Sequence, residues 1–382
     1  MDYAERERLL LAPYAMHAAE SAGRVHAEPT HAYRSPYQRD RDRVVHSAAY
    51  RRLAYKTQVF TGPLLSRRGG DYHRTRLTHT QEVASIARTL ARALRLNEDL
   101  VEALALVHDI GHPPFGHAGE DLLNERLAGQ GGFNHNRQAL RIVERIERRY
   151  PEFPGLNLTR EVLEGQGRRG RKGAVAGDHE TASPLLEVQV VDAADSIAYD
   201  AHDADDALEL GVLELGELRE VDLWREATAA VERRFTCLDD GQLRRAVIHQ
   251  LLDRQVGDLL GCTRRRIAER RPASPDEARR SPPLVAGTPE LAEQKRLLER
   301  FLFDRVYRHP LVLAHRLEAT AALGELFDRA VADAAANADA GGLPAPFGQI
   351  AAEEGPRRAA ADYVSSVTDR FALDSQQTLA GG

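Results

Sequence analysis

The sequence predicts an all-α fold on three observations. Apolar residues recur at intervals of three and four along several long stretches, which is the spacing of one face of a helix. Helix-ending residues follow some of these stretches, as Gly111 and Pro151 do. Alternation of apolar and polar residues never extends beyond four or five positions, apart from a short hairpin candidate around Val59 and Phe60. Because no internal repeat is visible, we expect one large helical domain with appended segments.

The predicted helices follow one another with short connections. Thr78 or Thr80 is expected to cap the first of them, which places Glu82 in its first turn. Asn97 separates this helix from the second, which ends at Gly111 and the prolines after it. The expected ranges are 82–96, 98–108, 136–150, 186–210, 291–307 and 359–371.

Two segments without periodicity are predicted to be surface loops. Residues 165–184 are rich in glycine, arginine and lysine, and residues 271–289 contain five prolines. The expected organisation is an N-terminal arm, a core that carries the first loop, the second loop, and a C-terminal helical portion packed on the core. Their ranges are 1–34, 35–270, 271–289 and 290–382.

The composition is that of a soluble globular protein. The 382 residues allow a large core, and the hydrophobic and charged contents are 42% and 29%. No apolar run approaches the roughly 20 residues that cross a bilayer, and the polar start is unlike a secretory signal. The two cysteines cannot build a disulfide framework. We therefore expect a cytoplasmic protein without membrane contacts.

The net charge of −6 gives no general indication of nucleic-acid binding. Local basic runs occur at residues 168–172 and 264–271. Such runs are mostly solvated faces or loops, and otherwise they bind phosphates of a nucleotide or a strand. Binding of nucleic acid stays open on this evidence but is not favoured.

The stretch with most of the candidate functional residues begins at His108 and Asp109, where a predicted apolar helix ends. His112, His117 and Glu120 follow within 12 residues. Polar groups at the end of a buried helix are costly unless a partner satisfies them, so this density indicates a metal ion or an equivalent partner. If helices 82–96 and 98–108 run antiparallel, they form a helical hairpin, and His79 lies at the same end of it as His108. Two residues must lie close together in this way to bind one ion.

A further set of carboxylates lies on the predicted helix 186–210. At about 100° per residue, Asp192, Asp195, Tyr199 and Asp203 fall on one stripe of this helix. The stripe is either a solvated acidic face or the source of another metal ligand. Apolar neighbours such as Val190 indicate a buried helix and favour the ligand role.

The order His79, His108-Asp109, Asp195 resembles that of the HD-domain metal-dependent phosphohydrolases. Several other stretches resemble one branch of that family, the deoxynucleoside triphosphate triphosphohydrolases (dGTPase-like). These stretches are residues 40–47, 51–59, 74–79, 108–120, 132–136, 155–159, 307–310 and 368–371, which together span nearly the whole chain.

The resemblance implies an HD-domain helical fold with additional C-terminal helices, and hydrolysis of a dNTP to the deoxynucleoside and inorganic triphosphate. It also implies roles for individual residues. His79, His108, Asp109 and Asp195 match metal ligands. His117 and Glu120 match the catalytic pair, with the catalytic candidate His112 in the same loop and His135 as a second histidine that supports the pair. Arg76 and Tyr199 match phosphate contacts, and Gln58 and Asp203 match contacts to the sugar 3′-hydroxyl.

The ligand set suits one divalent ion, which the sequence leaves open as Mn²⁺, Mg²⁺, Fe²⁺ or Co²⁺. The resemblance further implies a homo-oligomer and allows for an activating nucleotide. An HD-type 5′-nucleotidase or phosphodiesterase is an alternative that keeps the metal site. A nucleotide-sensing or single-strand-binding protein is an alternative of another class.

Overall fold

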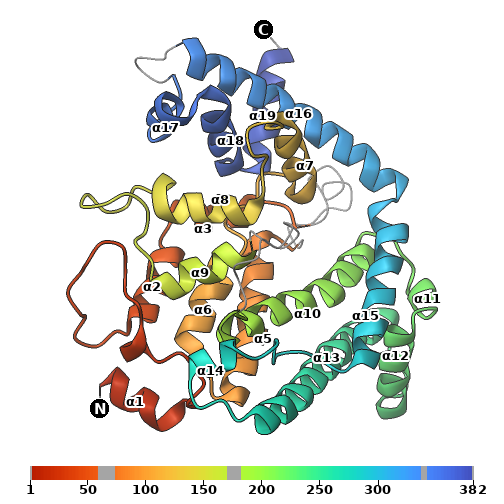
Figure 1. The fold of residues 1–382 in the computed structure, drawn as a ribbon. Helices are drawn as coiled ribbons and strands as arrows, with labels where there is room; N and C mark the ends of the chain where they lie inside the picture. Colours follow the sequence, from red (N-terminus) through yellow and green to blue (C-terminus); the bar gives the residue numbers. More distant parts are fainter. Residues whose placement is uncertain (1, 59–73, 170–181, 337–341, 381–382) are drawn as a thin grey trace. The chain divides into compact units, whose positions relative to one another are not determined.

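The computed structural model describes residues 2–58, 74–169, 182–336 and 342–380. The regular elements in these ranges are all helical, and β-pairing is limited to isolated bridges such as that between Arg24 and Thr159 (Figure 1). The all-α prediction is therefore confirmed. The hairpin expected around Val59 and Phe60 lies outside the described residues.

The chain divides into two compact units, each built from three segments. Unit 1 comprises residues 1–17, 82–102 and 176–313, and unit 2 comprises residues 18–81, 103–175 and 314–382. Three helices supply residues to both units, namely α5 (Arg76–Leu94), α6 (Glu98–Val107) and α16 (Pro310–Ala336).

Unit 1 is organised around the long helix α10 (Leu186–Glu209), which packs on α13 and α15. Its apolar side chains, among them Val190, Ala194 and Ile197, are buried. The predicted helix 186–210 is thus confirmed almost to the residue. The other helices of the unit are α1 (Tyr3–Leu10), α11 (Leu215–Leu218), α12 (Asp222–Arg234), α13 (Asp240–Arg270), α14 (Pro275–Arg279) and α15 (Pro289–Leu302), which continues as a π-helical turn, Phe303–Tyr307.

The helices that lie wholly in unit 2 have 5 to 12 residues. Within it α8 packs on α9, α2 on α3, and α17 on α18. Its helices are α2 (Pro36–Val45), α3 (Ala48–Arg52), α7 (Gly116–Arg126), α8 (His135–Arg141), α9 (Arg160–Arg169), α17 (Phe347–Glu354), α18 (Pro356–Ser366) and α19 (Asp369–Ala380), with 3-10 turns at Ala18–Glu20 and Leu53–Tyr55 and a π-helical turn at Ile142–Ile146.

The start of α5 differs from the sequence prediction. The helix begins at Arg76, so that Thr78, Thr80 and Glu82 all lie inside it. Thr75 and Thr78 cap it reciprocally, because the Thr75 amide donates to the Thr78 hydroxyl at 2.9 Å and the Thr78 amide donates to the Thr75 hydroxyl at 3.4 Å. This reciprocal pair satisfies two amides at the helix start, as a capping box does. The expected cap at Thr78 or Thr80 was wrong.

Two other predicted helices end earlier in the structure than the sequence predicts. The expected helix 136–150 ends at Ile146, where the Val143 carbonyl accepts a hydrogen bond from the Leu156 amide at 2.6 Å. The expected helix 359–371 is two helices, since α18 ends at Ser366 and Thr368 begins α19 by accepting the Phe371 amide at 3.3 Å.

Both segments predicted to be loops are partly helical. Residues 165–169 form the end of α9, and residues 275–279 form α14, whose cap is Ser274 and whose first residue is Pro275. Proline is favourable at a first helical position, so a proline-rich stretch still accommodates a short helix. The rest of the first loop lies largely outside the described residues.

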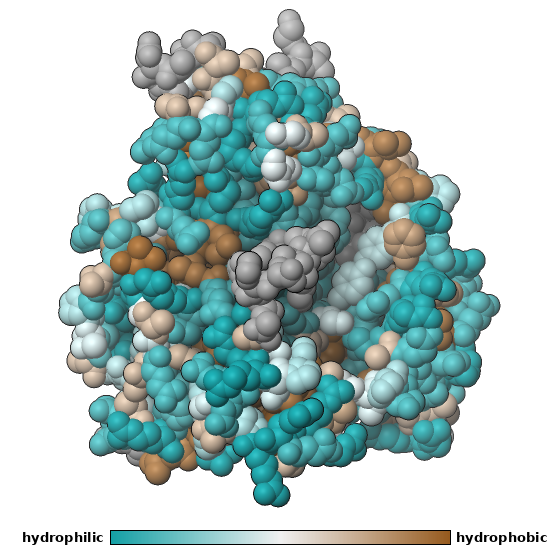
Figure 2. Space-filling model, in the orientation of Figure 1, coloured by the Kyte–Doolittle hydropathy of each residue, from teal (hydrophilic) through white to brown (hydrophobic). Residues whose placement is uncertain are grey.

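The surface seen in Figure 2 is mostly hydrophilic, with apolar residues in separate patches. Among the described helices, none combines the length and the apolar character needed to span a membrane.

Candidate metal centre and catalytic cluster

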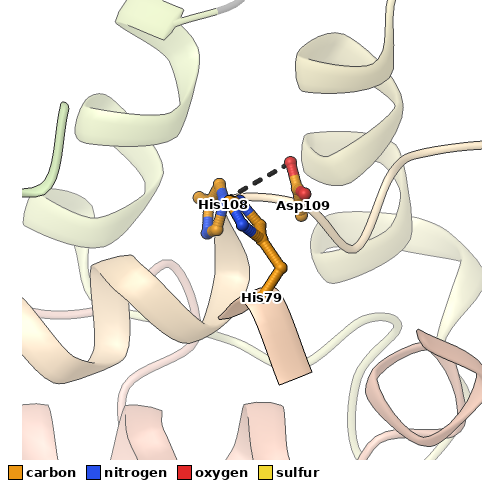
Figure 3. Close-up of side chains that lie close together, drawn as sticks. All are labelled: His79, His108 and Asp109. Atoms are coloured by element: carbon orange, nitrogen blue, oxygen red, sulfur yellow. Dashed lines mark ion pairs between the residues drawn. The ribbon is translucent and has the colours of Figure 1, made fainter. Parts of the chain in front are cut away.

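Three predicted metal ligands come together in unit 2 (Figure 3). His79 lies in the first turn of α5, and His108 and Asp109 directly follow α6. Their residues are only 2%, 1% and 6% exposed, and one ligand atom from each lies within 4.8 Å of the other two. The expected pairing of His79 with His108 and Asp109 is thus what the structure shows. These three residues are called the metal centre below.

The ring of His108 is oriented by its own helix. Its Nδ1 lies 2.6 Å from the Ala105 carbonyl oxygen, which can only accept, so Nδ1 carries the proton and donates it. Nε2 therefore has the lone pair, and it lies 3.4 Å from Oδ1 of Asp109. A carbonyl that accepts from the second nitrogen is the usual support of a metal-binding histidine.

Asp109 is a carboxylate with both oxygens engaged. Oδ1 lies 3.1 Å from Nδ1 of His112, and Oδ2 accepts from Arg76 at 2.8 Å. Burial raises the pKa of Asp109, but the neighbouring rings of His108 and His112 and the guanidinium of Arg76 outweigh burial and hold the pKa well below its usual value.

The donors of the metal centre fit a divalent cation. Two imidazoles and one carboxylate suit Mn²⁺, Fe²⁺, Co²⁺ or Zn²⁺ and, less well, Mg²⁺, and three protein ligands leave positions for water and substrate. Asp195, the fourth predicted ligand, lies on α10 in unit 1. Its approach to the same ion stays a prediction.

Gly111 explains how the turn after α6 lies against α8. A Cβ atom at this position would clash with the His135 carbonyl oxygen and the Ala139 amide nitrogen, which are backbone atoms and cannot move aside cheaply. Only glycine permits this close approach of two backbones. The approach brings His135 to the histidines of the turn.

The four predicted catalytic residues, His112, His117, Glu120 and His135, form a second group next to the metal centre, called the catalytic cluster below. The rings of His112 and His135 stack with centroids 3.8 Å apart. Nδ1 of His135 lies 2.9 and 2.8 Å from the two carboxylate oxygens of Glu120, and Nδ1 of His117 lies 3.4 Å from Oε2 of Glu120. His112 contacts Asp109, so the two groups are continuous.

Within the catalytic cluster the side chains differ in access and charge. His117 has a side chain that is 67% exposed, whereas that of His112 is only 4% exposed. Burial, together with the charge of Arg76, lowers the pKa of His112 well below its usual value, so this ring is neutral. Burial raises the pKa of Glu120, but hydrogen bonds from His117 and His135 outweigh it and lower the pKa far below the usual range. His117 is therefore the most exposed ring of the catalytic cluster, and the Glu120 carboxylate beside it is charged.

The residues predicted to contact substrate fall in both units. Arg76 and Gln58 lie beside Gly116 at the start of α7, where an added Cβ would stand 2.8 Å from Nη2 of Arg76 and 3.4 Å from the Gln58 carbonyl oxygen. Tyr199 and Asp203 lie on α10 in unit 1. The Tyr307 hydroxyl donates to Oδ2 of Asp203, a contact that was not predicted.

Lys56 and Asp369 hold the loop 108–115, which connects α6 to α7, and neither was predicted as a site residue. Nζ of Lys56 donates to the His112 carbonyl at 2.6 Å and to the Ser365 carbonyl at 2.7 Å. Asp369 accepts the amides of Thr57 at 2.8 Å and of Phe115 at 3.1 Å. Both lie in motif stretches of the sequence, but their contacts join segments about 300 positions apart, as the separations of 309 and 312 show.

Comparisons with known proteins agree with this description. The model of the HD domain matches residues 76–200, and that of the phosphohydrolase-associated domain matches residues 285–378. A "deoxyguanosinetriphosphate triphosphohydrolase-like protein" of Ralstonia pickettii (strain 12J) is 44% identical over 376 residues, 97% of this chain and 94% of the relative. Proteins with the same description from Thiobacillus denitrificans and Geobacter sulfurreducens are 43% and 41% identical, and the aligned regions cover 96% and 98% of this chain and 96% of each relative.

The HD match contains the metal centre and the catalytic cluster, and the relatives align over almost their whole length. These findings support a metal-dependent phosphohydrolase. The chain belongs to the family of deoxyguanosinetriphosphate triphosphohydrolase-like proteins and carries its HD domain.

Proposed function

We propose that the chain hydrolyses deoxynucleoside triphosphates at the α-phosphorus, releasing the deoxynucleoside and inorganic triphosphate. The observation that carries the proposal is the junction of the two groups in unit 2, where Asp109 of the metal centre lies 3.1 Å from His112 of the catalytic cluster. A metal site that lies next to residues able to transfer a proton suits the cleavage of a phosphate ester. The descriptions of the relatives support the choice of substrate.

In this reaction the oxygen of water joins the α-phosphorus, the bond from phosphorus to the 5′-oxygen breaks, and the 5′-oxygen takes up a proton. The bound cation would neutralise phosphate charge and lower the pKa of water. His79, His108, Asp109 and Asp195 would hold it.

His117 is proposed to supply the proton that the 5′-oxygen needs. Its Nδ1 faces Glu120, so that Nε2 is directed away from the carboxylate on a largely exposed ring. An imidazole is the side chain that most often serves as a general acid or base. Glu120 fixes the ring and stabilises its charged form, and the His135 side chain and backbone amide hold Glu120 in turn.

Arg76 is proposed to contact phosphate oxygens, since a guanidinium can bind two of them at once. Tyr199 is proposed as a second phosphate contact that also fits tightly against the sugar and excludes a ribose 2′-hydroxyl. Gln58 and Asp203 would bond the 3′-hydroxyl, with Tyr307 holding the carboxylate of Asp203.

Product analysis tests the proposal. The metal-stripped protein is loaded with Mn²⁺ and incubated with a mixture of all four dNTPs, so that any activating nucleotide is present. Deoxynucleosides and intact triphosphate are the expected products. Pyrophosphate or monophosphate as the product would support a nucleotidase or phosphodiesterase instead, and binding without turnover would support a sensor.

A further inference from the structure

Two amide side chains are linked to the ring nitrogen of His135 that faces away from Glu120, since Gln166 contacts Asn136 and Asn136 contacts this nitrogen. The first, Gln166 of α9, is buried, and its Nε2 lies 3.3 Å from the His108 carbonyl oxygen and 3.4 Å from the Asn136 carbonyl oxygen. Carbonyl oxygens only accept hydrogen bonds, so this end of the Gln166 amide must be its NH₂ group.

The orientation of Gln166 determines that of Asn136. Oδ1 of Asn136 lies 3.2 Å from the same Nε2 of Gln166, which requires an acceptor at this place. The other end of the Asn136 amide, Nδ2, then faces Nε2 of His135 at 2.9 Å. Because an NH₂ group only donates, Nε2 of His135 must accept, and the ring carries its proton on Nδ1.

That proton is directed at Glu120. Nδ1 of His135 lies within 2.9 Å of both carboxylate oxygens, and the His135 backbone amide donates to Oε1 at 2.9 Å. Glu120 is thereby held with Oε2 also facing Nδ1 of His117. Reversing the Asn136 amide would set two NH₂ groups against each other and free His135 to take the other tautomer.

We propose that Asn136 and Gln166 are positioning residues that fix His135 in its Nδ1–H tautomer, so that Glu120 always receives a donor from His135 and stays aligned with His117. The tautomer follows from the hydrogen-bond geometry alone. Its effect on turnover rests on the proposed function. His117 is then the ring of the catalytic cluster that exchanges a proton with substrate.

The substitution Asn136→Asp tests the proposal because it keeps the shape and removes the donor. The carboxylate still accepts from Gln166 but must also accept from Nε2 of His135, so the ring gains a proton there. ¹⁵N spectra of the full-length chain labelled in its histidines report this directly, with the His135 signals assigned by their loss in His135→Gln. We expect one protonated and one unprotonated ring nitrogen in the wild type, Nδ1 and Nε2, and two protonated nitrogens in Asn136→Asp.

The kinetic readout is the division of the effect between kcat and KM. Loss of the group that hydrogen-bonds the second ring nitrogen of a functional histidine typically lowers activity about 10–100-fold. We therefore expect kcat of Asn136→Asp to fall by about that factor, with little change in KM. Asn124→Asp is the matched control, because Asn124 is exposed and its Oδ1 accepts the Phe133 amide at 3.0 Å, a role that aspartate keeps. Its spectra and kcat should equal those of the wild type.

Gln166→Met provides a second variant that does not add a charge. It removes the NH₂ group that orients Asn136, so signals of both His135 tautomers are expected. A wild-type ring protonated on Nε2, or an Asn136→Asp variant with the wild-type spectrum and kcat, would overturn the proposal. If the wild type releases no triphosphate, the proposed function fails, while the spectra still decide the tautomer.

Discussion

Glu120 contacts two histidines of the catalytic cluster, His117 and His135. Its two oxygens accept from the side chain and the backbone amide of His135, and Oε2 also faces His117. The hydrogen bonds from the two rings outweigh burial and keep its pKa far below the usual range, so the side chain is charged at neutral pH. A neutral residue at this position would lose its hold on His117.

Glu120→Gln is therefore expected to lower kcat by about 10²–10⁴-fold, the usual contribution of a positioned acid–base group, while KM changes little. The amide places an NH₂ group against a ring N–H and misaligns His117. Steady-state kinetics of deoxynucleoside release measure the effect. Glu125→Gln, an exposed position on the same helix α7, is the control. Equal kcat values for the two variants would remove Glu120 from the machinery.

The residues of the metal centre were predictable from the sequence, whereas their supporting residues were not. His79, His108 and Asp109 follow from local spacing and the hairpin, because their positions depend on neighbouring helices. The contacts of Gln166 could not be predicted because the segment 165–184 has no apolar periodicity, although its first residues are helical. The role of Asn136 depends on that of Gln166, so it could not be predicted either.

At the scale of elements, Lys56 and Asp369 both hold the loop 108–115. Lys56 joins it to the end of α18, and Asp369 joins it to the start of α19. Lys56 donates to the carbonyls of His112 and Ser365, and Asp369 accepts the Thr57 and Phe115 amides. These contacts explain why the expected helix 359–371 is interrupted. The interruption could not be predicted because the partners lie more than 250 positions away, as the Phe115–Asp369 separation of 254 shows.

Lys56→Met is expected to destabilise the protein, since it leaves two carbonyl oxygens unsatisfied at about 1–3 kcal/mol each. It should also change the pH dependence. Burial lowers the pKa of Lys56 to about 7, although the charge of Asp369 opposes this effect. From pH 7 to about pH 9 the unfolded lysine keeps a proton that the folded one releases, so wild-type stability rises with pH over this range.

Urea unfolding of wild type and Lys56→Met at several pH values measures both effects. The variant should be less stable and show a flatter pH dependence between pH 7 and about pH 9. Arg51→Met, an exposed position on α3, should follow the wild-type curve. A variant curve parallel to that of the wild type would show that Lys56 stays charged in the folded protein.

A second connection between elements holds unit 1 together. Lys295 of α15 lies 2.5 Å from Oδ2 of Asp200 on α10, and the Asp200 side chain is fully buried. Burial raises the pKa of Asp200 to about 7, in spite of the opposing charge of Lys295. Removing the lysine alone would leave a buried carboxylate without a counter-charge.

Lys295→Met is expected to lower the free energy of unfolding by about 3–5 kcal/mol, and the double change Asp200→Asn with Lys295→Met should recover most of this loss. Chemical denaturation of the two variants and the wild type checks this expectation. If both variants are equally destabilised, the packing of Lys295 matters and its charge does not.

At the scale of the whole molecule, metal binding and stability should be linked. A cation that binds only the folded chain stabilises it by about 2.7 kcal/mol at a concentration 100 times its Kd. Mn²⁺ should therefore raise the Tm of the metal-stripped wild type and leave that of His108→Ala unchanged. His249→Ala, an exposed histidine on α13, should respond as the wild type does. The same Mn²⁺ shift in His108→Ala would place the ion elsewhere.

The fold class and the long amphipathic helices could be predicted because they depend on local periodicity, as α10 shows. The division into two units could not, because each unit joins three separate stretches of chain and α5, α6 and α16 contribute to both. The metal centre and the catalytic cluster lie in unit 2, whereas Asp195, Tyr199 and Asp203 lie in unit 1.

In the proposed reaction, water attacks the α-phosphorus of a dNTP at the metal centre. Turnover in H₂¹⁸O, followed by mass spectrometry of both products, tests it most directly. We expect one ¹⁸O atom in the released triphosphate and none in the deoxynucleoside, with no product from His108→Ala. Label in the deoxynucleoside, or in a monophosphate or pyrophosphate product, would contradict it.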